Sequence, residues 1–401
     1  MNRRPVAITG LGIFCGAGKD IPSFTDALVH GRSGIGPIDL FDVSSFPSRI
    51  GVQVKEYDPC DHFRRNVAAR LSRADQFGVI AAREALDDSG VREAHDPCDL
   101  GVVVGAGAGG MFQAEQWLKA VVAGKKGHPG LLRGLLPDKT STAIAEFCRV
   151  AGYQGTVTTA CSSSATAIGW GADLVATGQL AGVVCGGADT LSILTFAGFN
   201  SLKVVDPDPC SPFSLGRQGI SLGEGAAFMV LEDADAARRR GARIHGYVLG
   251  YGVAGEAYHM TAPEPSGLAA ARVMTEALRA AGVDESMVGW VNAHGTGTPL
   301  NDVIESKAMK LVFRERVNDV PLVSTKALTG HCLGAAGAIE AVATMLALGR
   351  GFIPRTLHFR GRDPECDLDY CHEGPRPTGA TIALSNSFAF GGNITSLVLS
   401  R

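Results

Sequence analysis

Short apolar runs alternate with stretches of helical periodicity along most of this chain. Runs typical of buried strands occupy residues 5–12, 99–105, 156–159, 181–187 and 225–232. Helices are predicted at residues 20–29, 64–89 and 111–147, the last broken at residues 127–130, whereas residues 35–61 read as irregular. Strands that alternate with helices in this way predict an α/β fold whose parallel sheets are covered on both faces.

The same succession begins again after a charged helix predicted at residues 233–241. Strand-like runs recur at residues 243–252, 288–294, 320–325, 381–385 and 394–399, with helices predicted at 266–282 and 333–348. This second set indicates a duplicated architecture. We therefore divide the chain into a first half, residues 1–242, with longer insertions, and a second half, residues 243–401.

Composition narrows the class of protein. The chain has 401 residues, of which 45% are hydrophobic and 19% charged, and its formal net charge is −3. A nucleic-acid-binding domain would be basic, so that class is disfavoured. We see no apolar run that approaches the ~18 residues of a membrane span and no signal peptide. The ten cysteines lack zinc spacings, and reduced thiols in a cytoplasmic protein are expected.

One cysteine stands in a setting that favours chemistry. Cys161 follows the predicted strand at residues 156–159 and precedes a helix with Ala165, Ile168 and Ala172 on one face. Helix N-termini favour negative charge, so we expect Cys161 to be biased towards the thiolate, its nucleophilic form. The alternative is an ordinary buried thiol.

Two histidines lie at corresponding turns of the second half. His294 follows the strand near residue 290, and His331 lies just ahead of the helix at residues 333–348. Open α/β sheets place ligands at the carboxyl ends of strands, so both histidines are expected near Cys161. Lys326 and Glu340 could form an ion pair that orders this site, or could be ordinary surface charges.

A cysteine with two histidines suggests acyl transfer, in which the thiolate accepts an acyl group and the imidazoles act at a second carbonyl. A zinc site would use the same residue types, but the flanking glycines and the absence of paired ligands argue against it. The turn at residues 388–392 could donate backbone N–H groups to an oxyanion, or be a plain turn. The glycines at 105–110 match a dinucleotide motif, yet no acidic residue ends a second strand downstream.

Several segments, in this order, resemble the β-ketoacyl-acyl carrier protein synthases, which are decarboxylating condensing enzymes of the thiolase fold. The type most similar is synthase II, which elongates acyl chains on a discrete carrier protein. The matching segments are Thr159-Ala-Cys-Ser-Ser163, Gly223-Glu-Gly225, residues 257–263, residues 294–302, Ser324-Thr-Lys326, Thr329-Gly-His331, residues 334–338 and Phe390-Gly-Gly392.

The resemblance implies a thiolase-like fold of duplicated βαβαβαββ halves that form a five-layered αβαβα core. It implies that Cys161 takes an acyl chain as a thioester, and that His294 and His331 hold the malonyl carbonyl and stabilise the enolate after decarboxylation. Lys326 and Glu340 match a supporting charged pair. The N–H groups of Cys161 and Phe390 would form an oxyanion hole, with Phe390 and Gly391 at a gate.

Further implications concern bound groups and partners. No cofactor would be required, because phosphopantetheine arrives on the acyl- or malonyl-loaded carrier. A homodimer is implied, and a heterodimer with a homologous subunit is also open. A structural cation would match Asn301, Glu305, Ser385 and Asn386. The acidic carrier could meet Arg64, Arg65, Arg70 and Arg73, which could instead be a solvated helix face.

The chain departs from the family pattern around the site, though not at the cysteine and histidines. It has Ser211-Pro-Phe-Ser214 for Arg-Pro-Phe-Asp, Gln218 for an acid or Asn, Glu256 for a gating-loop Asp, and a gate that reads Ala389-Phe-Gly-Gly-Asn-Ile394. We therefore expect a specialised elongating synthase of a polyketide or polyene pathway. Three rivals remain: a non-catalytic chain-length partner subunit, a non-decarboxylating thiolase and a dinucleotide oxidoreductase.

Overall fold

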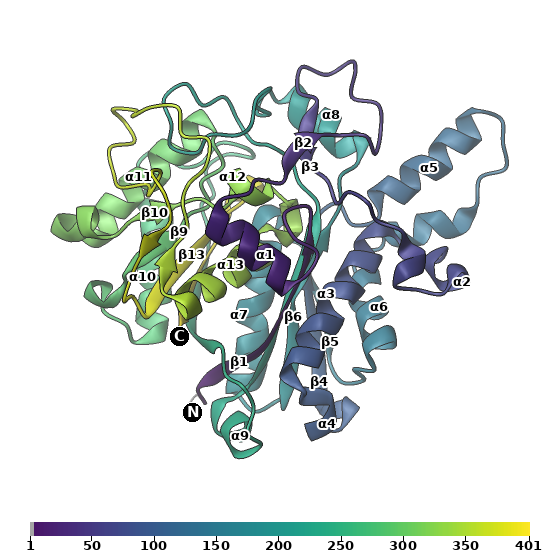
Figure 1. Cartoon of the computed structure of the whole chain (residues 1–401), viewed down its shortest axis with the longest axis horizontal. Coiled ribbons are helices and arrows are strands. Elements are labelled where there is room, and N and C mark those ends of the chain that lie inside the picture. The colour runs from purple at the N-terminus through teal and green to yellow at the C-terminus, as the bar shows by residue number, and fades with distance from the viewer. Residues whose placement is uncertain (1–3) are drawn as a thin grey trace.

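Ten strands form one mixed sheet in the computed structural model, which describes residues 4–401 (Figure 1). The strands of the sheet are β1 (Val6–Cys15), β4 (Leu100–Gly105), β5 (Gln154–Val157), β6 (Gly182–Asp189), β7 (Gly225–Asp233), β8 (Gly246–Gly255), β9 (Trp290–Asn292), β10 (Leu322–Val323), β13 (Ile382–Phe388) and β14 (Asn393–Ser400). Each of the ten strand-like runs of the sequence overlaps one of these strands, and most are short apolar runs that can be buried on both faces. The run predicted at residues 156–159 overlaps β5 only at residues 156–157, and β5 is partly exposed.

The two halves share one strand order. Outwards from the centre, the first half runs β1, β7, β6, β4 and β5, and the second runs β8, β14, β13, β9 and β10. β1 and β8 join the halves through a short antiparallel pairing from Val6↔Val248 to Ile8↔Gly246. The duplication predicted from the sequence is therefore present in the topology. The boundary after residue 242 remains a prediction; it lies between α9 (Ala234–Arg239) and β8.

The prediction of parallel sheets is only partly correct. β6, β4 and β5 are parallel, as are β13, β9 and β10, but β7 and β14 run antiparallel to both of their neighbours. The reason is visible at β13 and β14, which are joined by a short turn that reverses the chain without a crossover helix.

Helices occupy three layers around the sheet (Figure 1). α7 (Ser163–Ala176) and α13 (Ala336–Arg350) pack in the central core between the two halves, as the contacts of Ile168 and Val342 show. α3 (Arg73–Ser89) and α6 (Lys139–Cys148) cover the outer face of the first half. α10 (Leu268–Ala281) and α11 (Pro299–Phe313) cover that of the second half. The order of layers is therefore helix, sheet, helix, sheet, helix.

One helical segment is long and apolar enough to cross a membrane by length and composition, contrary to our reading of the sequence. This segment, Leu333–Arg350, has a mean hydropathy of 1.3, and 83% of it is buried inside the protein. It contains α13, which is apolar all round because both halves of the ten-stranded sheet pack around it. Its composition is therefore explained by the central layer of the core.

Helix boundaries differ most from the predictions in the first half. The helix predicted at residues 64–89 is broken into α2 (Arg65–Ala68) and α3, because Ser72 accepts the N–H of Asp75 and Asp75 accepts the N–H of Ser72, which starts a new helix. The break predicted at residues 127–130 is wider, and the irregular segment contains a hairpin. The elements concerned are α5 (Met111–Val122), a 3₁₀ helix (Pro129–Leu135), β2 (Ile35–Pro37) and β3 (Ile50–Val52).

Two helices near the site were not predicted by the sequence analysis, α8 (Ile193–Ser201) and α11. The remaining elements are short or peripheral. They are α1 (Ile21–His30), α4 (Val91–Ala94), α12 (Lys326–Thr329), β11 (Phe352–Ile353), β12 (Arg376–Pro377) and 3₁₀ helices at Pro59–Asp61, Pro97–Asp99, Ala160–Ser162, Glu285–Met287, Arg314–Asp319, Leu333–Ala335 and Phe390–Gly392.

The glycine-rich segment after β4 is a packing device. A side chain at Gly105 would lie 2.2 Å from the backbone nitrogen of Ser164, and one at Gly107 would lie 2.4 Å from a carboxylate oxygen of Asp189. Glycine is needed there because neighbouring segments approach the backbone closely. The motif at residues 105–110 is thus accounted for without a dinucleotide.

Candidate active site

Cys161 lies in a tight turn that both halves of the chain contain. After β5, Ala160 has a left-handed backbone (φ 49°), and the 3₁₀ turn Ala160–Ser162 leads into α7. In the second half, Leu333 has the same φ of 49°, and its 3₁₀ turn leads into α13. Non-glycine residues seldom adopt this conformation. The repeated turn places Gly334 in the second half at the position that Cys161 has in the first.

His294 is held by a carboxylate below its backbone. It follows β9, is buried, and together with Gly295 donates its backbone N–H to Glu305, at 2.9 Å in each case. Glu305 lies on α11, so this helix fixes the position of the histidine. The imidazole Nδ1 lies 3.3 Å from the ammonium nitrogen of Lys326. Because an ammonium can only donate, this contact leaves the Nε2 of His294 to carry the ring proton.

His331 reaches the same arrangement by a different route. Its ring Nδ1 accepts the backbone N–H of Leu333 at 3.1 Å, and the backbone N–H of His331 donates to the Ser221 carbonyl at 2.7 Å. A neutral imidazole that accepts at Nδ1 carries its proton on Nε2. The two rings lie 5.4 Å apart, nearly perpendicular at 84°. The site therefore offers two Nε2–H donors from adjacent rings.

Both histidines are neutral at physiological pH. Burial lowers the pKa of His294 and of His331 well below the usual value, and the positive charge of Lys326 lowers each further. A neutral imidazole can both donate one hydrogen bond and accept a proton. The pair is therefore suited to polarise a carbonyl without carrying a charge of its own.

Lys326 and Glu340 form a buried ion pair, as one of the two readings of the sequence expected. Both side chains are almost wholly inaccessible to water. Burial raises the pKa of Glu340 to about 7, although Lys326 opposes this rise. The second carboxylate oxygen of Glu340 is buried without a hydrogen-bond partner. Since Lys326 also contacts His294, the pair fixes the orientation of that ring.

A cavity of about 300 Å³ brings these groups together. Cys161, His294 and His331 all line it, so the three residues predicted to form a site do share one space. Phe390 closes one side, where its ring stacks on that of Phe199 with centroids 5.8 Å apart. Phe199 belongs to α8 and was not expected from the sequence, since a phenylalanine in an apolar run gives no signal of its own.

The turn after β13 provides one donor near the cysteine. The backbone N–H of Phe390 bonds to the thiol of Cys161. By contrast, the N–H of Gly391, the other residue predicted at the gate, donates to the Met260 carbonyl at 2.8 Å. Gly391 instead allows the turn, because its φ is 81°. Phe390 keeps both predicted properties, a backbone donor and a side chain at the cavity wall.

The expected thiolate bias of Cys161 is wrong for the resting protein. Burial raises the pKa of the Cys161 thiol to about 11, and Lys326 and the Phe390 N–H only partly oppose this effect. Desolvation outweighs the helix terminus, because the cavity is apolar and the side chain is buried. The thiol must therefore lose its proton to a neighbouring base when it reacts.

This raised pKa predicts how Cys161 responds to alkylation. We expect the rate with iodoacetamide to rise roughly tenfold per pH unit between pH 7 and 9, because the thiolate fraction grows tenfold per unit below the thiol pKa. Intact mass with peptide mapping at Cys161 measures this rate. A rate that is already constant at pH 8 would contradict the raised pKa.

Three of the four predicted cation ligands make hydrogen bonds with neighbouring groups. Glu305 accepts the backbone N–H groups of His294 and Gly295 and the side-chain amide of Asn386, at 3.1 Å for the last. Asn301 donates to Asp302 at 3.2 Å. The Ser385 hydroxyl is buried without a hydrogen-bond partner. Glu305 therefore supports the His294 loop, and a cation at these four residues stays a prediction.

The four arginines of the predicted carrier surface do not act together. Arg64, Arg65 and Arg70 are exposed on or beside α2. Arg73 is largely buried, where it pairs with Glu224 at 2.6 Å and lies over the ring of Phe77. Arg73 is therefore a structural residue, and its inclusion in the surface was wrong. The reason is the break before α3, which turns Arg73 inwards.

Comparison with known proteins gives matches over the whole chain. The family model "Beta-ketoacyl synthase, N-terminal domain" matches residues 3–237, and "Beta-ketoacyl synthase, C-terminal domain" matches residues 245–360. The 3-oxoacyl-[acyl-carrier-protein] synthase 2 of Synechocystis sp. is 35% identical over 411 residues, with 100% of this chain and 99% of the relative covered. The enzyme of the same name from Coxiella burnetii is 35% identical over 412 residues, with the same coverage.

Solved structures show the same fold. The ishigamide ketosynthase/chain length factor superposes with a TM-score of 0.94 at 37% identity, covering 100% of this chain and 99% of that one. A ketosynthase from Xenorhabdus doucetiae, in complex with its chain length factor, gives 0.86 at 31% identity, with 99% and 98% covered. The thiolase-like fold expected from the resemblance is thereby confirmed.

Proposed function

The chain belongs to the β-ketoacyl synthase family of acyltransferases, and we propose that it extends an acyl chain by two carbons through decarboxylative condensation with a malonyl thioester. The observation that carries this proposal is the convergence of Cys161 with two neutral histidines in one cavity. The acyl chain and the malonyl unit would both arrive on the phosphopantetheine arm of a carrier protein. The enzyme would then need no cofactor of its own.

The first step is a thioester exchange. The Cys161 sulfur attacks the carbonyl carbon of the acyl thioester and forms a tetrahedral intermediate. The oxyanion of this intermediate accepts hydrogen bonds from the N–H groups of Cys161 and Phe390. Collapse of the intermediate breaks the bond to the carrier sulfur, which leaves as a thiol with the proton that the Cys161 thiol gives up. The acyl group remains on Cys161.

The second step forms the carbon–carbon bond. The malonyl thioester carbonyl accepts hydrogen bonds from the Nε2–H groups of His294 and His331, and loss of CO₂ leaves an enolate on that oxygen. The enolate carbon attacks the acyl carbonyl on Cys161, and the carbon–sulfur bond breaks. The thiolate of Cys161 recovers a proton. The dry cavity protects the enolate from water before it reacts.

We infer further that the enzyme serves a specialised polyketide or polyene pathway. Support comes from the departures at Ser211, Ser214 and Gln218 and from the ketosynthase/chain length factor match at 37% identity. The chain would then act with an acyl carrier protein and as a dimer, either with itself or with a homologous subunit. The ten free thiols of residues 4–401 fit a cytoplasmic enzyme.

The exposed arginines of α2 give a prediction about carrier docking. Changing Arg64, Arg65 and Arg70 together to glutamate is expected to raise KM for a carrier-bound substrate about tenfold, because an acidic carrier loses its attraction. The KM for a pantetheine thioester without carrier is expected to stay unchanged. Steady-state kinetics with both substrates, at low and high salt, measure the difference. Equal effects on both substrates would show that these arginines do not meet the carrier.

The proposed reaction is tested with purified protein and a panel of acyl carriers. The intact mass of the protein, with peptide mapping to Cys161, reports acyl loading. Formation of the extended product after malonyl carrier is added reports condensation. Each assay is run with and without a homologous subunit. Condensation by the chain alone supports a homodimer, and condensation only with the subunit supports a heterodimer. If Cys161 is never loaded under either condition, the chain is a non-catalytic partner subunit and the proposal fails.

A further inference from the structure

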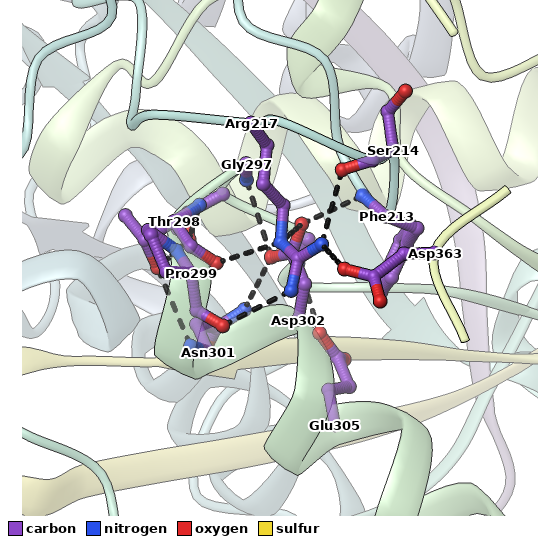
Figure 2. A network of polar contacts seen from close by, with 12 residues as sticks. Phe213, Ser214, Arg217, Gly297, Thr298, Pro299, Asn301, Asp302, Glu305 and Asp363 are labelled. Atoms are coloured by element: carbon purple, nitrogen blue, oxygen red, sulfur yellow. Dashed lines mark hydrogen bonds and ion pairs between the residues drawn. The ribbon is translucent and has the colours of Figure 1, made fainter. Parts of the chain in front are cut away.

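A buried arginine lies directly behind the wall of the reaction cavity. The side chain of Arg217 is only 4% exposed. Its Nε donates to the Thr298 carbonyl at 3.2 Å, and its terminal nitrogens donate to the carbonyls of Pro299 and Ser214 at 3.0 Å each. It also pairs with Asp363 (Figure 2). The guanidinium thus joins three chain segments at one point.

One of these segments is the loop that leaves His294. Thr296, Thr298 and Pro299 all line the cavity that contains Cys161. The loop also contains Gly295 and Gly297 in left-handed conformations, with φ of 40° and 81°. Glycines leave a loop many alternative conformations. The shape of this part of the cavity wall therefore depends on groups outside the loop.

The loop is fixed at its two ends by different residues. At the His294 end, Glu305 accepts the N–H groups of His294 and Gly295. At the other end, Asp302 accepts the Gly297 N–H at 3.2 Å, and Arg217 holds the carbonyls of Thr298 and Pro299 (Figure 2). Asp302 lies 3.6 Å from the Arg217 Nε, which provides charge balance. The histidine and the cavity wall are thus positioned separately.

Three of the departures from the family pattern, at Ser211, Ser214 and Gln218, lie near this arginine in the sequence. Ser214 supplies a carbonyl to Arg217, and its hydroxyl accepts the N–H groups of Arg360 and Gly361 at 2.6 and 3.1 Å. Ser211 carries a buried hydroxyl without a partner, and the Gln218 N–H donates to Asp206 at 3.3 Å. These three departures therefore lie around Arg217, apart from the reacting groups.

We propose that Arg217 is a positioning residue that shapes the Thr296–Pro299 wall for the arm of the thioester substrate, a role that rests on the proposed condensation reaction. Its hydrogen bonds to the Thr298 and Pro299 carbonyls hold the wall against which the substrate binds. The chemistry is left intact, because His294 is held by Glu305. A planar guanidinium can serve several acceptors at fixed angles, which an ammonium cannot do.

The test compares three variants with pantetheine thioesters that carry no protein, so that carrier docking does not enter. Arg217→Gln removes both the positive charge and the planar guanidinium, and Arg217→Lys removes the guanidinium but keeps the charge. Arg360→Gln is the matched control. Arg360 is an arginine of the same region that donates to the Pro209 carbonyl and not to the loop. We expect KM to rise about tenfold in both Arg217 variants with kcat within about threefold, and the control to be unchanged.

A purely structural role would give a different result. It would lower Tm and the fraction of protein whose Cys161 can be labelled, while KM of the labelled fraction stayed as in the wild type. Unchanged KM in both Arg217 variants overturns the inference. If these variants do not fold, Asp363→Asn, which weakens the anchor of Arg217 at a partly exposed residue, decides by the same KM criterion. A wild type without condensation activity would refute the proposed reaction instead.

Discussion

Replacing Cys161 by alanine is expected to abolish acyl loading and to reduce condensation by at least about a thousandfold, because Cys161 supplies the thiol that lines the cavity. The substitution removes a small buried side chain next to an existing cavity, so the fold should persist. Intact mass after incubation with acyl carriers measures loading, and product formation with malonyl carrier measures condensation.

The chain offers a matched control for this experiment. Cys148 is also buried, but it lies in the outer layer of the first half, away from the cavity. Cys148→Ala should therefore load acyl groups at the wild-type stoichiometry of one per chain. Acyl transfer that persists in Cys161→Ala would show that another residue is the nucleophile, and the assignment of the cavity would then be wrong.

His331→Ala should separate the two steps of the reaction. Loss of its Nε2–H removes one of two donors to the enolate oxygen, so we expect malonyl decarboxylation to fall about 10²–10³-fold. Acyl loading of Cys161 should change by only a few fold, since the oxyanion of that step is bound by backbone N–H groups. Release of CO₂ from malonyl carrier and the mass of Cys161 measure the two steps independently.

A surface histidine provides the comparison for this variant. His30 lies at the exposed end of α1, where it pairs with Asp26, and His30→Ala should leave both steps unchanged. If His331→Ala reduces loading as strongly as decarboxylation, the histidine serves the first step as its base. The assignment of acyl loading to the backbone N–H donors and of decarboxylation to the imidazoles would then be wrong.

The hydrophobic pattern was sufficient for the strands because it depends only on local composition. Each strand is a short apolar run, and burial between helix layers requires nothing else. Helix boundaries were less predictable, since they depend on caps that compete with the apolar period. Ser72 shows this, because its reciprocal bonds with Asp75 start α3 inside a stretch whose periodicity runs continuously from residue 64.

The reacting residues were predictable for a similar reason. Cys161 and His294 each follow a strand, His331 follows α12 just ahead of α13, and all three stand next to glycines or small residues, so each carries a local signal. Properties that arise from tertiary packing have no such local signal in the sequence. The raised pKa of Cys161, the stacking of Phe199 on Phe390 and the position of Arg217 depend on segments that lie far apart in the sequence.

Arg73 shows why a charge pattern alone is a weak guide to a binding surface. Four arginines within ten positions suggest one basic face. Three of them are exposed, but the fourth is turned towards Glu224, a buried carboxylate that needs a positive partner. The sequence gives no sign of this ion pair, since residues 73 and 224 lie far apart along the chain.

The place of β1 in the sheet has a consequence for biosynthesis. This strand pairs with β7 and β8, so neither partner exists until the ribosome has translated about half of the chain. At ~5–20 residues per second, β1 waits roughly 10–45 seconds with its largely apolar sequence unpaired. An exposed strand of this kind invites association with other nascent chains. Slower translation or loss of a holding chaperone should therefore lower the yield of this enzyme more than that of a protein with sequentially paired strands.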